Sequence, residues 1–330
     1  MKQRARIDYL LRHVSNFMPY VTLAKLYNLV LNLIELQLKV AQPRSLPFYL
    51  KVEPTPLCHM ACAGCAHGDA ELKKTLTHHA EHLRVEDFKK IIDPIARRVF
   101  GVSLSLRGEP LLGKELFSIA EYAHSKKIAV SFPSNLSVKL GVEKLTRLVT
   151  SGIDTVYVSL DGISDATYAQ YRVGGDFQLV LRNVRAIAEI KARLGQARPK
   201  LVWKFVVFEH NRHEVPSVSR EYRRLGFDAF ELVEDYTSDA GKRTLRNHNA
   251  NLVRQRKGCF WAWHTTTIRA DGKVGPCCHG HHDFGLGNAR STNFRDIWRG
   301  AEYARLRRGF RTMQASDLHP VCARCLHVLP

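Results

Sequence analysis

The chain has 330 residues, 45% of them hydrophobic and 25% charged, which is the composition of an ordinary globular protein with a sizeable core. The sequence has no internal repeat, low-complexity tract, Walker loop or dinucleotide-binding glycine pattern, which excludes those classes. Fifty basic residues against 31 acidic ones give a net charge of +19, which indicates an acidic partner: a phosphorylated or nucleotide-linked metabolite, an anionic lipid or nucleic acid.

The first 47 residues precede the first predicted strand and contain an amphipathic helix. Apolar residues between Leu23 and Val40 are spaced mostly three or four apart, as on one helix face, and polar residues interrupt the run. No uninterrupted stretch approaches the roughly 20 apolar residues that a membrane span needs. We expect this segment to pack on its own domain. The alternatives are that it covers a substrate channel or lies on a membrane surface.

Three cysteines in the spacing C-x3-C-x2-C follow a strand predicted at 48–53: Cys58, Cys62 and Cys65. Three thiolates on one short loop can ligate three irons of a four-iron cluster and leave the fourth iron open to a small molecule. A structural zinc site is the alternative, with His59 or His67 as its fourth ligand. Because the chain starts without a secretory signal, we expect reduced cysteines in a cytoplasmic protein rather than disulfides.

Six strand-like runs alternate with helical stretches, at 48–53, 100–106, 128–133, 154–160, 200–208 and 228–233. Parallel strands with helical crossovers form either an open sheet or a barrel. Both arrangements place their chemistry at the carboxyl ends of the strands. The polar residues that follow these strands are therefore candidates for a site, although such residues also cap helices.

The five remaining cysteines all lie between Cys259 and Cys325. An Asp-Gly turn at 271–272 between two short β-runs predicts a hairpin that brings Cys259 back towards Cys277, and the terminal C-x2-C, Cys322 and Cys325, supplies two more ligands. Four thiolates around one site make a closed cluster, and zinc is again the alternative. The spacing leaves Cys278 as the thiol without a place in either group.

The cysteine loop, and the turn after the second strand, resemble the radical S-adenosylmethionine (SAM) superfamily. In that family the unique iron of a [4Fe-4S] cluster binds SAM, and a Gly-Gly-Glu-Pro turn contacts the methionine amino group. Here Arg107, Gly108 and Glu109 stand at that turn, with Arg107 in place of the first glycine. The resemblance implies an α/β fold: a partial (β/α)6 TIM-like barrel over residues 48–240, with 1–47 as a separate helical segment.

The resemblance also implies further contacts to SAM at later strand ends. Polar groups after the third and fourth strands contact the ribose and methionine in that family, which makes Asn135 and Ser159 the candidates here. Arg172 is a candidate for the SAM carboxylate, because a guanidinium pairs with a carboxylate through two hydrogen bonds. Asp161 is a candidate substrate contact, and Lys204, inside an otherwise apolar strand, either faces the barrel interior or is an ordinary surface lysine.

Residues 241–330 resemble the auxiliary-cluster extension called SPASM, or its shorter form, Twitch. A ligand cysteine follows the hairpin glycine after four residues in that family, as Cys277 follows Gly272 here. The resemblance implies a small β-hairpin/helix domain with one auxiliary [4Fe-4S] cluster on Cys259, Cys277, Cys322 and Cys325. Cys278 is then either an inert thiol or a hydrogen-atom donor to a substrate radical.

The resemblance implies an enzyme that cleaves SAM reductively and uses the 5′-deoxyadenosyl radical to abstract hydrogen from a C–H bond. We expect a sugar-like or anionic small metabolite as substrate, dehydrogenation or epimerisation as outcome, and flavodoxin or ferredoxin as electron donor. A peptide maturase and a lipid-modifying enzyme are the alternatives within enzymes. A zinc-stabilised, basic nucleic-acid-binding module is the alternative of another class, although we do not expect a nucleic-acid partner. Peripheral membrane contact would be made through the N-terminal helix.

Overall fold

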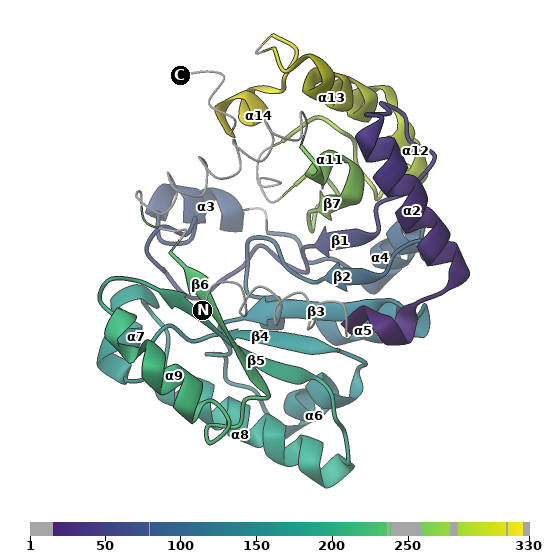
Figure 1. Ribbon diagram of the computed structural model, residues 1–330. Coiled ribbons are helices and arrows are strands. Elements are labelled where there is room, and N and C mark those ends of the chain that lie inside the picture. The colour runs from purple at the N-terminus through teal and green to yellow at the C-terminus, as the bar shows by residue number, and fades with distance from the viewer. Residues whose placement is uncertain are drawn as a thin grey trace.

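The computed structural model of the protein describes residues 16–78, 80–235, 238, 259–277, 283–314 and 316–325 (Figure 1). Its described strands form one eight-stranded sheet in the order β6-β5-β4-β3-β2-β1-β7-β8. The first six strands pair in parallel, each with its neighbour in the chain. Their bounds are β1 (Tyr49–Val52), β2 (Gly101–Ser103), β3 (Ala129–Ser134), β4 (Thr155–Ser159), β5 (Lys200–Val207) and β6 (Ala229–Glu234). The predicted partial barrel is confirmed: five of the six strands begin and end within one residue of their predicted bounds, and β2 ends three residues earlier than predicted.

Helices connect these strands, and most of them cover the outer face of the curved sheet, whereas the first, at 70–78, buries none of its residues (Figure 1). They are α3 (Ala70–His78), α4 (Val85–Ile92), α5 (Leu116–Ser125), α6 (Val142–Thr150), α7 (Asp165–Tyr171), α8 (Phe177–Leu194) and α9 (Val215–Glu221). Capping fixes the longest: the Asp176 side chain accepts from Leu179 N at 2.8 Å, and Gly195 ends α8 in the left-handed conformation. Apolar residues of α8 and the side chains of Trp203 and Phe205 of β5 are buried in the same hydrophobic core.

The opposite face of the sheet lines the barrel interior and is more polar. Side chains alternate along a strand, so Tyr157 and Ser159 of β4 lie on the face away from the buried Val156 and Val158. Interior residues therefore come from alternate positions of each strand, and this polar surface is where a substrate can be held.

The C-terminal segment extends the same sheet. Strand β7 (Thr265–Ile268) and β8 (Val274–Gly275) form the predicted antiparallel hairpin, with Gly272 at a φ of 85° in its turn. The hairpin is not a separate sheet, because β7 also pairs in parallel with β1 from Tyr49 to Val52. Short helices complete this part: α11 (Trp261–His264), α12 (Phe294–Arg299), α13 (Ala301–Thr312) and α14 (Pro320–Cys325).

A dense run of arginines on α12 and α13 is only partly a solvated face. Arg307 is fully buried, lies over the rings of Trp298 and Tyr303 at 4.2 and 4.6 Å, and donates to the carbonyl oxygens of Ala262 and Trp298. Burial lowers the pKa of Arg307 to about 9. This cation joins the C-terminal helices to α11, and is not available to an external polyanion.

Helix α2 (Leu23–Gln37) packs on its own domain as expected, but through its polar side chains. It lies across the amino-terminal ends of the strands, where Asn28 Nδ2 donates to Leu46 O at 2.9 Å and Asn32 Nδ2 to Trp263 O at 2.6 Å. Glu35 accepts from the backbone nitrogens of Arg44 and Ser45. Of the helices described, none combines the length and apolar character that crossing a bilayer requires.

Candidate active site

The cysteine loop after β1 is held by close backbone contacts with two other loops. A Cβ on Gly108 would lie 2.3 Å from Thr55 O and 2.5 Å from Leu57 O, so only glycine allows the turn after β2 to approach this loop. Glu109 N donates to Leu57 O at 2.7 Å, and Ala61 N donates to Val173 O at 2.9 Å. Loops that are distant in sequence therefore fix where the three thiols stand.

Two nitrogen donors are directed at the cysteine sulfurs. Asn135 Nδ2 lies 4.0 Å from Cys58 Sγ, and Arg172 Nη1 lies 3.8 Å from Cys62 Sγ. Burial, with smaller contributions from the charges of Glu109 and the other two cysteines, raises the pKa of the Cys58 thiol to about 11. Thiols that resist ionisation alone, beside donors that stabilise negative sulfur, suit ligation to iron, which supplies the missing positive charge. The donor set fits a [4Fe-4S] cluster.

Glu109 forms the centre of a buried polar cluster at the ends of β2 and β3. Its carboxylate accepts from Ser134 Oγ at 2.7 Å, from Asn135 N at 2.8 Å and from Leu111 N at 3.1 Å. Burial nevertheless raises the pKa of Glu109, because three neutral donors only partly replace water. A cationic ammonium group would restore the balance, which is the chemistry predicted for this residue.

Arg172 is engaged by protein groups. Its Nε donates to Asp161 Oδ2 at 2.6 Å, and Asp161 is fully buried and also accepts from Val206 N at 2.6 Å. Although burial opposes it, the charges of Asp161 and Cys62 raise the pKa of Arg172, so the guanidinium stays charged. Arg172 thus positions Cys62. Its contact to the SAM carboxylate and the substrate contact of Asp161 stay predictions.

Arg107 forms an ion pair with Glu53, a residue that the sequence did not mark as part of the site. Its Nε donates to Glu53 Oε1 at 2.6 Å, and the two side chains are 10% and 0% exposed. Glu53 also accepts from Ala270 N at 3.1 Å, in the C-terminal hairpin. The available signal was a lone glutamate at the end of an otherwise buried strand. The SAM contact of Arg107 stays a prediction, and Gly108 acts on the loop through its backbone.

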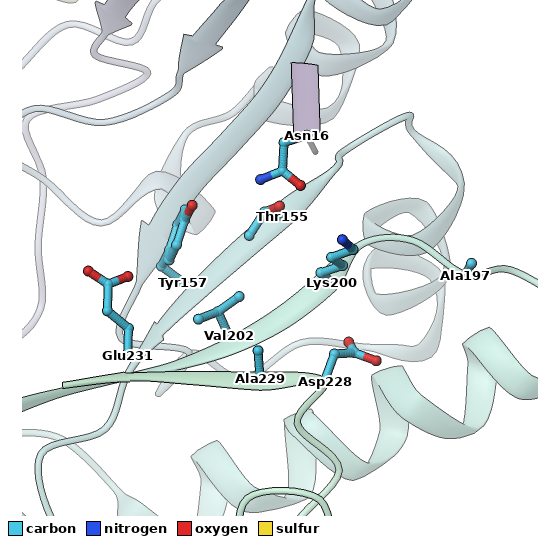
Figure 2. A pocket seen from close by; sticks show the side chains of 9 residues that line it. All are labelled: Asn16, Thr155, Tyr157, Ala197, Lys200, Val202, Asp228, Ala229 and Glu231. Carbon is cyan, nitrogen blue, oxygen red and sulfur yellow. The ribbon is translucent and has the colours of Figure 1, made fainter. Parts of the chain in front are cut away.

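Ser159 lies at the carboxyl end of β4, opposite Lys204 in the β4–β5 register. Lys204 in turn lies opposite Glu231 of β6 and two residues from Val202. Tyr157, Val202 and Glu231 line one cavity of about 350 Å³ (Figure 2). Lys204 therefore shares the interior face, as one of its two alternatives predicted.

A second lysine faces the interior from β1. Lys51 lies two residues from Tyr49, whose hydroxyl is 3.4 Å from Ser131 Oγ. Ser131 pairs with Thr155, which lines the cavity, so Lys51 and Tyr49 belong to the interior face. The cavity itself lies near the first residues of β4, β5 and β6, whereas the cysteines follow the last residue of β1.

Three of the four thiols predicted for the auxiliary site lie near enough to influence one another's ionisation. Burial first, and then the charges of Cys259 and Cys325, raise the pKa of Cys322. Cys277 follows β8, and its charge contributes to the raised pKa of the buried Tyr303. In the described ranges no three Cys, His, Asp or Glu side chains converge on one ion, so a cluster assignment rests on donor chemistry and family rather than on side-chain convergence. Cys278 lies outside the described residues.

A parallel α/β barrel with three thiols after its first strand, and a second cysteine group beyond its last, defines an iron-sulfur enzyme class. The Radical SAM superfamily model matches residues 52–195, and the SPASM model, an iron-sulfur cluster-binding domain, matches residues 259–326. The chain therefore contains a radical SAM domain and a SPASM domain. It is accordingly an enzyme that uses SAM and [4Fe-4S] clusters, and not a zinc-stabilised binding module.

Two relatives and one solved structure are similar to this chain. The AdoMet-dependent heme synthase of Methanosarcina barkeri is 23% identical over 326 residues, covering 84% of this chain and 91% of that protein. The mycofactocin maturase MftC of Mycobacterium tuberculosis is 29% identical over 143 residues, which are 43% of this chain and 34% of that protein. Streptococcus suis SuiB bound to its precursor peptide SuiA shares the fold, with a TM-score of 0.63 and 15% identity over 90% of this chain and 73% of that one.

Proposed function

We propose that this radical SAM enzyme abstracts a hydrogen atom from a C–H bond of an anionic small metabolite held in the barrel interior. The observation that carries the proposal is the pair of lysines, Lys51 and Lys204, on the interior faces of β1 and β5. Cations in a partly enclosed interior complement an anionic group such as a phosphate or carboxylate. The net charge of +19 adds a long-range attraction for the same class of substrate.

The residues of the chain divide the work by position. When bound, the cluster and SAM together supply a carbon-centred radical that removes hydrogen from an unactivated carbon. Asn135 and Arg172 donate to the sulfurs of Cys58 and Cys62, and Glu109 would receive the SAM ammonium group. Lys51 and Lys204 orient the substrate, and the enclosing strands exclude water that would otherwise quench the reaction.

Two outcomes are open to the substrate radical, and they use different groups. Dehydrogenation would remove one electron and one proton from the radical. Cys259, Cys277, Cys322 and Cys325 would hold the auxiliary cluster, which would serve as the electron acceptor. Epimerisation instead requires a hydrogen atom from a thiol, for which Cys278 is the candidate. An external one-electron donor such as flavodoxin or ferredoxin supplies the electron for SAM cleavage.

The test uses reduced, cluster-loaded protein with deuterated substrates. A panel of sugar phosphates is compared with the corresponding neutral sugars, and deuterium is followed into 5′-deoxyadenosine. The proposal predicts transfer from the anionic compounds only. Lys204→Met should raise KM for an active anionic substrate about 10- to 100-fold, the value of one charge-assisted hydrogen bond, while SAM cleavage without substrate is unchanged. Lys144→Met, on the exposed side of α6, is the matched control. Equal turnover of neutral sugars would refute the proposal.

A carboxylate-bearing tetrapyrrole is the second candidate substrate. The heme synthase relatives are similar over most of this chain, whereas the maturase relatives, which favour a peptide, match 43% of it. A tetrapyrrole with carboxylates is also anionic, so the same lysines serve it. Including one in the deuterium panel separates the two candidates directly.

A further inference from the structure

Helix α2 presents an apolar face to solvent. Of the fifteen large hydrophobic side chains that are exposed in the described residues, nine lie between Met18 and Leu38. Leu23 and Leu38, near the two ends of the helix, are 86% and 70% exposed. The members of this apolar face on the helix and its flank are Met18, Val21, Leu23, Leu26, Tyr27, Val30, Leu33, Ile34 and Leu38.

The orientation of α2 is set by its opposite face, which is polar and buried. At about 100° per residue, Lys25, Asn28, Asn32 and Glu35 form one stripe, roughly opposite the stripe of Val30 and Ile34. The buried stripe is satisfied by specific partners: Lys25 Nζ donates to Lys127 O, Asn28 to Leu46 O and Asn32 to Trp263 O. Rotating the helix to bury its leucines would separate these polar groups from their hydrogen-bond partners, which is unfavourable. No side chain among the described residues covers the apolar face, which makes the face a candidate contact surface.

The charges around the apolar face are positive. Between residues 16 and 47 the only acidic side chain is Glu35, which is buried against the domain. Arg98 lies beside the face, with its guanidinium carbon 5.6 Å from the centre of the Tyr27 ring and a hydrogen bond to Ala24 O. Lys127 stands at the Lys25 end, and Arg44 and Arg299 meet near the far end, where Arg299 Nη2 donates to Arg44 O. An apolar stripe with a basic rim is complementary to a negatively charged lipid surface.

We infer that α2 docks the protein on an anionic lipid bilayer, lying in the plane of the interface with its apolar face at the boundary between headgroups and acyl chains. Tyr27, an aromatic side chain with a polar tip, suits that depth, and Arg98 beside it suits the lipid phosphates.

The position of α2 also decides which way the active site faces. The helix covers the amino-terminal ends of the strands, whereas Cys58 follows the carboxyl end of β1, about 13 Å further along at 3.3 Å per residue. Figure 1 shows α2 and α3, the helix that follows the cysteine loop, on opposite sides of the sheet, so a docked protein would hold that loop away from the lipid. The substrate then comes from the aqueous side, which disfavours a lipid-modifying reaction on a carbon within the bilayer.

The test is co-sedimentation of the full chain with vesicles of phosphatidylcholine mixed with phosphatidylserine, and with phosphatidylcholine alone. We expect binding to the mixed vesicles that weakens at high salt. Val30→Asp with Ile34→Asp should weaken binding about 100-fold, at about tenfold for each apolar side chain kept out of the interface. Val142→Asp is the matched control, because Val142 is also a helical valine that is more than half exposed, on α6.

The remaining outcomes overturn the inference. Wild-type protein that ignores mixed vesicles, or a double variant that binds as tightly as the wild type, would refute the docking. A lipid-free dimer that the double variant converts to monomer would show instead that a second copy covers the face. Thermal unfolding of each variant, followed by circular dichroism, confirms that lost binding is not lost folding, as expected for substitutions at exposed positions.

Discussion

Replacing Arg107 with Met should destabilise the protein, because it breaks the buried ion pair with Glu53. Among the described residues, Arg107 is the only cationic side chain that pairs with Glu53, whose side chain is 0% exposed. The Glu53 carboxylate accepts hydrogen bonds from Arg107 and from Ala270 N. The glutamate would be left buried with one backbone donor. Its alternatives are to take up a proton or to open the contact between the turn after β2 and the C-terminal hairpin.

The expected loss of unfolding free energy is about 3–5 kcal/mol, the cost of breaking a buried ion pair from one side. Total stabilities of about 5–15 kcal/mol make this a large fraction of the whole. Adding Glu53→Gln to Arg107→Met removes the orphaned charge. The double variant should therefore be more stable than the sum of the single losses by about 2 kcal/mol, within the usual range for directly coupled residues.

Urea unfolding of metal-free protein, followed by far-ultraviolet circular dichroism, measures all four members of this cycle. Arg305→Met is the matched control, because Arg305 pairs with Glu302 on the surface of α13 with side chains 71% and 48% exposed. That pair should contribute about 0–1 kcal/mol. If Arg107→Met costs no more than Arg305→Met, the buried pair does not join the two loops energetically and the reasoning fails.

Other substitutions address the site and the N-terminal helix. Glu109→Gln should weaken SAM binding about 10- to 100-fold, as measured by anaerobic calorimetry. When the pH is lowered, the affinity of the wild type for SAM should begin to fall before the pH reaches the ordinary glutamate pKa of about 4.3. The reason is that burial raises the pKa of Glu109 and only the ionised form attracts an ammonium group. Constant wild-type affinity down to that pH would contradict this. Asn135→Ala should lower the midpoint potential of the SAM cluster by about 40 mV. The reason is that the variant loses roughly one hydrogen bond, which stabilises the more negative, reduced cluster more than the oxidised one. An unchanged potential in a redox titration would exclude the contact to Cys58. Gly108→Ala should reduce iron bound per chain, since its Cβ would fall 2.3 Å from Thr55 O, whereas Gly141→Ala, with nothing within 4 Å, should load normally. Burial and the nearby Lys127 lower the pKa of Lys25 to about 8. Lys25 therefore loses its proton more readily in the folded than in the unfolded protein. Its contribution to stability should rise as the pH increases from about 8 towards the pKa of about 10.4 in the unfolded chain. Lys25→Met should remove that slope from urea unfolding measured across this range, and parallel curves for the two proteins would contradict the burial of a charged Lys25.

The strands and the thiols were predictable because their signals are local. A buried parallel strand needs a largely apolar run, and residues 201–207 form one that only Lys204 interrupts. Cluster ligands need thiols at short spacings, and such spacings can be read directly from the sequence. Both kinds of signal are carried by residues that are neighbours in sequence.

The missed features depend on partners that are distant in sequence. Periodicity predicts that α2 has two faces, but not that Asn32 finds Trp263 O across 231 residues and turns the polar face inward. Arg307 in the basic run carries no mark that distinguishes it from its exposed neighbours, and its burial follows from the packing of α11 against α13. The role of Glu53 likewise became visible only once β1, the turn at Arg107 and the hairpin were in one place.

The parallel pairing of β7 with β1 means that the auxiliary region is not a detachable module. Strand β1 leads directly into Cys58, and it has a neighbour on each side only because β7 occupies its second edge. A chain cut before β7 would leave that edge with open backbone donors and acceptors, ready to recruit foreign strands. A chimaera that exchanges the region after β6 between such enzymes should therefore also keep a β1 that can pair with the new β7. Without that pairing, we expect the chimaera to aggregate through the open edge of β1.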